Sequence, residues 1–294
     1  MNNVAAVIVS YNNSAMLQSL LGDIASQNRP PDRIIVVDNA SSDGTQEAIK
    51  TQFPDIDYIR MPENTGSAGG YHHGMKAALE KSQYIWTLDD DVRLYPDTLE
   101  ELLKGFESLK RCCKLGAVRS AGATHPEDHP TRLHIISWRG ALFSTEAVSE
   151  VSLPLPEYFL YGEDLDFSLR LARKGYHCFW IPTSHCVENR NKGKIETRLF
   201  SHVNKIYSSP FRLYYAFRNQ TAIYLKFGAF VSFCRTLLYG LKVISFCLIA
   251  RCEGKSERIR AILMGISDGL GGRLGKNPLY DPEKELEVPD WKIT

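Results

Sequence analysis

The chain has 294 residues, 44% hydrophobic and 23% charged, an ordinary composition for a folded protein of one large domain or one domain with an appended segment. Its net charge is +1, yet residues 1–189 carry a net −8 and residues 190–276 a net +12, so we expect an acidic body followed by a basic segment that faces an anionic partner. The seven cysteines contain no CxxC pair, which argues against a disulfide framework or a zinc site and favours a reducing compartment.

The first 88 residues alternate between strand and helix patterns. Strands are expected over residues 4–10, 33–37, 57–60 and 84–88. Helical patterns lie between them, from Leu17 to Ile24, after an expected N-cap at Thr45, and over residues 75–81. The chain begins directly with a strand, so we expect no signal peptide. This alternation predicts an α/β fold, a mostly parallel sheet with helices on both faces, in which ligands bind beyond the carboxyl ends of the strands.

The second half of the chain is less regular and then changes in composition. Strands are predicted over residues 132–137, 141–144 and 176–181, and a helix over residues 166–174. Residues 211–224 are aromatic and basic, and residues 227–250 are strongly apolar. We therefore predict one domain over residues 1–210 and a C-terminal helical segment over residues 211–294.

The apolar run over residues 227–250 approaches the length of a transmembrane helix but contains Arg235 and Lys242. Each cation would cost roughly 2.5–3.5 kcal/mol near the centre of a bilayer. The two cations are seven residues apart and therefore on one helix face, which favours a helix at the membrane surface. Packing of this helix within the protein is the alternative.

Three consecutive carboxylates, Asp89, Asp90 and Asp91, follow the fourth predicted strand. Such crowding is costly unless a cation neutralises it. On an extended backbone Asp89 and Asp91 point the same way, and two hard oxygen ligands suit Mg²⁺ or Mn²⁺ shared with substrate phosphates. The sequence therefore predicts a metal–diphosphate site, with a solvated acidic turn as the alternative.

Three further positions carry candidate chemistry. Asp38 ends the second strand and can accept hydrogen bonds from a nucleobase or ribose, or cap an Asx turn. The glycine-rich segment over residues 64–74 is expected to be a loop that brings the backbone close to a phosphate before a helix, or a tight turn. The adjacent pair Glu163 and Asp164 supplies a candidate general base, or caps a helix.

Together, the N-terminal pattern, the Asp38 strand end, the Asp89–Asp91 cluster and the Glu163–Asp164 pair resemble glycosyltransferase family 2, with its GT-A fold, over roughly residues 4–220. The resemblance implies roles for the following positions: Ser10, Tyr11 and Asp38 at the nucleobase; Asn64, Gly66 and Gly69 beside the donor; Asp90 near the donor sugar or ribose; Asp89, Asp91 and His185 on the metal. It also implies that Asp164, next to Glu163, deprotonates the acceptor hydroxyl.

Two aromatic segments are candidate acceptor positions. The Trp138-Arg139-Gly140 segment can offer an indole face to a sugar, with core packing of Trp138 as the alternative. Tyr214-Tyr215-x-x-Arg218-Asn219 resembles a motif of family members that act on lipid-linked or polysaccharide acceptors. Its Arg218 can reach a phosphate or form a structural ion pair.

The resemblance implies an inverting, metal-dependent transferase that uses a UDP-sugar and Mn²⁺ or Mg²⁺. The Asn-Thr-Gly-Ser-Ala-Gly-Gly segment, with Leu-Asp-Asp-Asp-Val, resembles the galactofuranosyltransferase branch, so UDP-galactofuranose is the expected donor and dTDP-rhamnose the alternative. The expected acceptor is a surface glycan such as O-antigen, or a lipid-linked glycan, and the expected location is cytoplasmic and peripheral at the inner face of the membrane. A non-catalytic sugar-nucleotide-binding module and a nucleotidyltransferase are the other hypotheses. Nucleic-acid binding is not expected, because the basic stretch contains no recognition motif.

Overall fold

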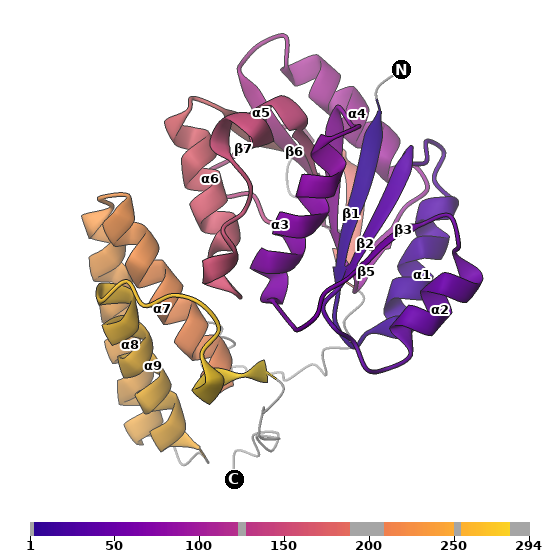
Figure 1. Ribbon diagram of the computed structural model, residues 1–294. Helices are drawn as coiled ribbons and strands as arrows, with labels where there is room; N and C mark the ends of the chain where they lie inside the picture. Colours follow the sequence, from indigo (N-terminus) through magenta and orange to yellow (C-terminus); the bar gives the residue numbers. More distant parts are fainter. Residues whose placement is uncertain (1–2, 123–127, 189–208, 250–253, 283–294) are drawn as a thin grey trace. The chain divides into compact units, whose positions relative to one another are not determined.

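The computed structural model describes residues 3–122, 128–188, 209–249 and 254–282 (Figure 1). Its chain divides into two compact units. The first comprises residues 1–156 and 164–191, and the second comprises residues 157–163 and 192–294. The second unit thus includes a short segment, residues 157–163, that is far in sequence from the helices it belongs with.

The first unit is a mixed sheet with helices on both faces. Its strands are β1 (Val4–Ser10), β2 (Arg33–Asp38), β3 (Asp57–Arg60), β4 (Tyr84–Asp89), β5 (Val92–Leu94), β6 (Leu115–Ala121), β7 (Thr131–Leu133), β8 (Ala141–Ser144) and β9 (His177–Glu188). Its helices are α1 (Ser14–Ala25), α2 (Thr45–Gln52), α3 (Gly66–Leu79), α4 (Thr98–Leu109), α5 (Thr145–Val151) and α6 (Glu163–Arg173).

The strand order is β3-β2-β1-β4-β8-β6-β9-β5, and β7 pairs with β9. Strands β3, β2, β1 and β4 are parallel, whereas β8 is antiparallel to both β4 and β6. One set of alternating strand residues packs under α1, α2 and α4, and the other set packs under α3, α5 and α6. This three-layer arrangement confirms the α/β sheet predicted from the sequence, and the parallel half is the part with strand–helix alternation.

The second unit is helical. It contains α7 (Pro210–Lys226), α8 (Phe230–Ile249), α9 (Lys255–Leu270) and two short 3₁₀ turns, η1 (Pro156–Tyr158) and η3 (Pro278–Tyr280), the first of which begins in the first unit. Gly265 and Gly269 let α9 lie close to the α7 backbone, because a Cβ at Gly265 would be 2.6 Å from the Tyr214 carbonyl oxygen. The predicted helical C-terminal segment is therefore a packed bundle with its own apolar cluster.

Several predicted element boundaries were wrong. Thr45 is the first residue of α2 rather than its N-cap, and Asp43 accepts hydrogen bonds from its backbone N–H at 3.2 Å and its hydroxyl at 2.5 Å. The strand predicted over residues 132–137 ends at Leu133, because the Ile136 N–H donates to the Ser168 hydroxyl on α6 at 2.9 Å instead of to a strand. The helix predicted from residue 166 begins at Glu163, and the strand predicted over residues 176–181 extends to Glu188.

Candidate active site

The carboxyl ends of β2, β1 and β4 lie side by side. Ser10 on β1 is opposite Asp38 on β2, and Val9 is opposite Asp89 on β4. In a parallel sheet this register delivers the side chains that follow each strand to a single edge. Ser10, Asp38 and Asp89 therefore lie at the same edge of the sheet.

Asp90, the middle of the three consecutive carboxylates, accepts hydrogen bonds from the β1–α1 turn. Its Oδ2 accepts a hydrogen bond from the Ser10 hydroxyl at 2.6 Å and a longer one from the Tyr11 N–H at 3.4 Å, and its Oδ1 accepts one from the Asn13 amide at 2.9 Å. Burial raises the pKa of Asp90 to about 6, and the charges of its two Asp neighbours act in the same direction. Asp90 therefore ties the β1–α1 turn to the end of β4, and Asn13 is a member of the site that the sequence did not single out.

Asp90 and Asp91 form a turn between β4 and β5, so the extended backbone assumed for them was wrong. This turn leads from β4 to β5, which pairs with β9 and not with β4, and the period-2 argument does not apply to a turn. Asp89 still belongs to β4, where its Oδ1 accepts a hydrogen bond from the Tyr71 hydroxyl at 2.8 Å. Tyr71, buried on α3, thus positions the first carboxylate and was also missed from the sequence.

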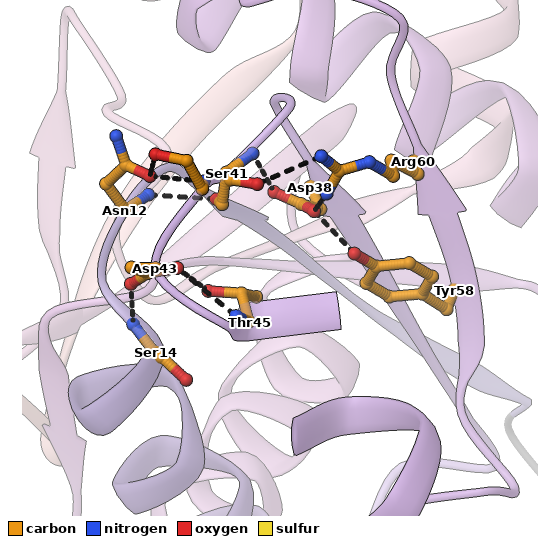
Figure 2. A network of polar contacts seen from close by, with 9 residues as sticks. Asn12, Ser14, Asp38, Ser41, Asp43, Thr45, Tyr58 and Arg60 are labelled. Carbon is orange, nitrogen blue, oxygen red and sulfur yellow. Dashed lines mark hydrogen bonds and ion pairs between the residues drawn. The ribbon is translucent and has the colours of Figure 1, made fainter. Parts of the chain in front are cut away.

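Asp38 is fully buried at the centre of a polar network (Figure 2). Its Oδ1 accepts from the Ser41 N–H at 2.9 Å, and its Oδ2 accepts from the Arg60 guanidinium at 2.6 Å and from the Tyr58 hydroxyl. Burial, reinforced by the Asp38 charge, raises the pKa of Tyr58. The carboxylate is thus already bonded to protein donors, and the Ser41 contact is the predicted cap. Contact of Asp38 with a nucleobase stays a prediction.

Hydrogen bonds connect the loop after β1 to the loop after β2 (Figure 2). The Asn12 N–H donates to the Ser41 hydroxyl at 2.9 Å, and the Ser14 N–H donates to Asp43 at 2.8 Å. A surface hollow beside this network is lined by Ser41, Ser42, Gly44, Gln46, Glu47, Lys50 and Arg60. The network therefore fixes the wall of a hollow that opens beside Arg60.

The glycine-rich segment is mostly helix, so the loop predicted over residues 64–74 was wrong beyond its first two residues. Helix α3 begins at Gly66, whose N–H donates to Asn64 Oδ1 at 2.9 Å. The glycines serve helix–sheet packing, because a Cβ at Gly70 would lie about 2.4 Å from Val9 Cγ1. Gly69 lies in the same turn. Asn64 is 4% exposed, and its Oδ1 caps the start of α3 by accepting the hydrogen bond from Gly66.

Glu163 and Asp164 occupy the first turn of α6. Asp164 stays partly accessible to water, and its Oδ1 accepts a hydrogen bond from the Leu165 N–H at 2.8 Å. Desolvation raises its pKa, the Asp89 charge raises it further, and the Arg119 charge opposes the rise. Glu163 is buried. The charges of Asp89 and Arg119 therefore both act on the candidate base, and no sequence pattern points to Arg119.

Trp138 lies in the apolar core rather than on an open face. Its side chain is 4% exposed and packs against Tyr71 and Phe167, with ring centres 5.0 and 5.3 Å away. Arg139 forms an ion pair with Glu188, and Gly140 adopts a left-handed conformation with φ of 65°. The packing favours the core alternative for Trp138, and acceptor contact by this segment stays a prediction.

Arg218 and Asn219 are buried on α7, and both donate hydrogen bonds to backbone carbonyls within residues 157–161. Arg218 donates to the carbonyl oxygens of Tyr158 at 3.0 Å and Gly275, and its Nε donates to Asn219 at 2.8 Å. Asn219 Nδ2 contacts the carbonyl oxygens of Tyr158, Leu160 and Tyr161. This placement favours a structural role for Arg218; contact with an acceptor phosphate stays a prediction.

The segment held by Arg218 and Asn219 is conformationally strained. Phe159 and Tyr161 have φ of 61° and 64°, a region that side-chain-bearing residues rarely adopt, and Gly162 follows with φ of 90°. Glu163 and Asp164 come next in the chain. Strain of this kind persists only where surrounding contacts impose it, so the α7 pair maintains the backbone that leads into the candidate base.

The donor set of the acidic cluster fits a hard divalent cation. Asp89 and Asp91 supply two carboxylates, and Mg²⁺ or Mn²⁺ is commonly held by one or two carboxylates plus substrate phosphates. No group of three potential ligands is preassembled among the residues that the structure describes. His185 Nδ1 is buried without a hydrogen-bond partner in that part of the chain. Ligation by His185 stays a prediction.

The fold is that of known sugar-nucleotide transferases. Staphylococcus aureus TarS 1–349 in complex with UDP-GlcNAc matches with a TM-score of 0.61 at 14% identity, over 92% of this chain and 83% of that one. A Pyrobaculum calidifontis mannosyltransferase in complex with GDP-Man and Mn²⁺ matches with a TM-score of 0.57 at 18% identity, over 94% and 76%. The mixed sheet flanked by helices, with acidic side chains at its strand ends, defines a GT-A glycosyltransferase fold.

The chain belongs to glycosyl transferase family 2. The model of that family matches residues 5–159, and the model of glycosyl transferase family group 2 matches residues 130–251. The galactofuranosyltransferase GlfT1 of Mycolicibacterium smegmatis is 27% identical over 205 residues, 58% of this chain and 66% of the relative. The undecaprenyl-phosphate mannosyltransferase of Micrococcus luteus is 24% identical over 215 residues, 65% and 87%. The chain thus spans about two thirds of the length of the first of these relatives.

Proposed function

We propose that this family 2 glycosyltransferase moves galactofuranose from UDP-galactofuranose to a hydroxyl group of a cell-surface or lipid-linked glycan, with inversion at the anomeric carbon. The similarity to galactofuranosyltransferases supports the donor. The observation that carries the reaction class is the placement of Asp38 and Asp89 at the carboxyl ends of strands in one parallel sheet, with Asp164 in the first turn of α6 in the same unit. A glycan acceptor of this kind is assembled at the cytoplasmic face of a membrane, and we place the protein there as a peripheral enzyme.

Asp164 is the proposed general base. Its carboxylate takes the proton of the acceptor hydroxyl while that oxygen forms a bond to the anomeric carbon. The bond between the anomeric carbon and the diphosphate oxygen breaks in the same step, and the nucleoside diphosphate leaves with the electron pair. A pKa raised by burial makes Asp164 a better proton acceptor than an ordinary aspartate, and its partial exposure leaves room for a hydroxyl.

Asp89 and Asp91 would hold Mg²⁺ or Mn²⁺, which neutralises charge on the departing diphosphate when it is bound. Tyr71 orients Asp89 by donating to its Oδ1, and Ser10 and Asn13 orient Asp90 by donating to its two carboxylate oxygens. We propose that the Asp38 network and Asn64 line the donor at the nucleobase and the α3 N-terminus. Each of these groups orients another residue or binds the donor, and none of them transfers a proton.

The test separates binding from transfer with Asp164→Asn. The expected result is loss of transfer by at least about 10³-fold, with UDP binding in the presence of Mn²⁺, measured by calorimetry, unchanged within about twofold. Asp55→Asn is the matched control, because Asp55 is an exposed aspartate in the turn before β3. Transfer retained in Asp164→Asn would remove Asp164 as the base. Loss of UDP binding as well would assign Asp164 to the donor site instead.

A further inference from the structure

Helix α8 carries an exposed apolar stripe. Five of its large apolar side chains have exposed fractions between 61% and 69%, namely Phe230, Val231, Leu238, Leu241 and Leu248. At 100° per residue they span an arc of about 100° around the helix axis. Exposed apolar residues scattered singly are ordinary, but a contiguous stripe along one helix marks an interaction surface.

The opposite face of α8 is already used for packing. Val243 and Cys247 are fully buried in the apolar cluster of the helical unit, and Thr236 is 6% exposed. The stripe is therefore a second apolar face on a helix that needs only one face to pack against its neighbours. Burial within the helical unit does not explain it.

Two exposed cations lie along one edge of the stripe. Arg235 and Lys242 are about 60° and 40° around the axis from Leu238, both on the same side. Residues 226–250 contain a third cation, Lys226, and no Asp or Glu. Long basic side chains at the edge of an apolar face can keep their charges at a polar headgroup layer while their stems lie on the acyl boundary.

The charges favour a helix that lies on a membrane over one that crosses it. The segment Phe230–Leu248 is long and apolar enough to cross a membrane, and 22% of its most apolar 18-residue stretch is buried in the protein. Crossing would place Arg235 and Lys242 near mid-bilayer, and it would also pull Val243 and Cys247 from their packing. Lying in the interface plane keeps both the packing and the charges.

We propose that this face of α8 docks onto an anionic lipid bilayer. The apolar stripe enters the boundary between headgroups and acyl chains, and Arg235 and Lys242 contact lipid phosphates. The net charge of +12 over residues 190–276 adds attraction to the same kind of surface. The proposal deepens the proposed function, because a lipid-linked acceptor would be presented at such a surface.

The experiment is flotation of the full-length protein with vesicles of phosphatidylcholine, with and without 30 mol% phosphatidylglycerol. Binding is expected to the anionic vesicles and to fall with added salt. Arg235→Gln and Lys242→Gln should each weaken it about fivefold, the factor that about 1 kcal/mol per cation corresponds to. Lys81→Gln, at an exposed lysine after α3 and outside residues 190–276, is the control and should change binding less than twofold.

A second pair of variants tests the apolar stripe. Leu238→Glu with Leu241→Glu should weaken binding at least tenfold, while Leu279→Glu, at a leucine 67% exposed outside α8, should weaken it less than twofold. Because these leucines are exposed, the variants should keep the thermal midpoint of the wild type.

Three outcomes would overturn the proposal. They are equal binding to neutral and anionic vesicles, retention of the protein in the vesicles after a carbonate wash as for a spanning helix, and a dimer that Leu238→Glu dissociates without any vesicle binding. The assay uses no sugar nucleotide. Failure of docking with intact transfer would therefore leave the proposed function standing, and the reverse result would leave the docking standing.

Discussion

Replacing Asn219 with alanine is the sharpest test of how the segment before Asp164 is held. The Asn219 side chain is fully buried, and its Nδ2 lies within hydrogen-bond reach of the carbonyl oxygens of Tyr158, Leu160 and Tyr161. Its Oδ1 also accepts from Arg218 Nε at 2.8 Å. Alanine removes every one of these contacts while leaving the helix propensity of α7 intact or improved.

The size of the effect follows from the groups left behind. Nδ2 has two protons, so at most two strong hydrogen bonds to carbonyl oxygens are lost, together with the acceptor of a guanidinium N–H. Each buried polar group left without a partner costs about 1–3 kcal/mol, and partial relaxation reduces the sum. We expect the free energy of unfolding to fall by roughly 2–5 kcal/mol. Gln220→Ala, whose nearest side-chain contact is Thr236 at 3.4 Å, is the control and should cost less than about 1 kcal/mol.

Urea unfolding followed by circular dichroism measures the stability, and steady-state transfer measures the consequence for Asp164. Because the strained residues Phe159 and Tyr161 lose their support, kcat should fall while the KM for the donor changes little. A loss of stability no larger than that of Gln220→Ala, with kcat unchanged, would refute the reasoning that this pair maintains the backbone leading into the base.

Three other predictions concern the first unit. Gly70→Ala should lower the free energy of unfolding, measured with urea, by about 1–3 kcal/mol, because its Cβ would collide with Val9. Gly22→Ala on α1 should raise it by about 0.5–1 kcal/mol, because a Cβ there meets nothing within 4 Å. Equal effects of the two variants would refute the packing argument. Asp164→Asn should be more stable than the wild type at pH 7, because burial raises the pKa of Asp164 in the folded state and the wild type loses stability as pH rises through that pKa. The difference in unfolding free energy should vanish below about pH 4, where the carboxyl group is protonated in both states. A variant less stable than the wild type at pH 7 would contradict this prediction. Chelation with EDTA and Asp91→Ala should each abolish transfer, and activity that survives EDTA would exclude the proposed metal.

The parallel half of the fold was predictable because its signals are local. Strand patterns alternate with helical spacing from residue 4 to residue 88, and the placement of Ser10 and Asp38 at the carboxyl ends of parallel strands follows from that alternation. In the antiparallel half, β8 lies at the residues predicted for a strand, 141–144, but its place in the sheet was not predictable, since it pairs with β4, more than 50 residues earlier in the chain. The glycines of α3 misled the prediction, because their function in packing against Val9 can be seen only when the helix lies on the sheet.

The site could be predicted where chemistry is concentrated in neighbouring residues. Asp89–Asp91 and Glu163–Asp164 stand out as adjacent carboxylates. The partners that orient them do not, because Tyr71 and Asn13 reach the acidic cluster from other elements. The burial of Trp138 illustrates the same limit, since an aromatic residue beside a turn has one sequence pattern whether it packs in a core or faces a sugar.

The most direct test of the central claim is a donor screen with Mn²⁺ and a crude lipid-linked acceptor. Nucleotide release is followed with UDP-galactofuranose, UDP-galactopyranose, UDP-glucose and dTDP-rhamnose, and each reaction is repeated with Asp164→Asn. Acceptor-dependent release from UDP-galactofuranose alone, absent in Asp164→Asn, is the predicted result. Release from dTDP-rhamnose instead would contradict the donor, and release that persists in Asp164→Asn would contradict the proposed reaction step.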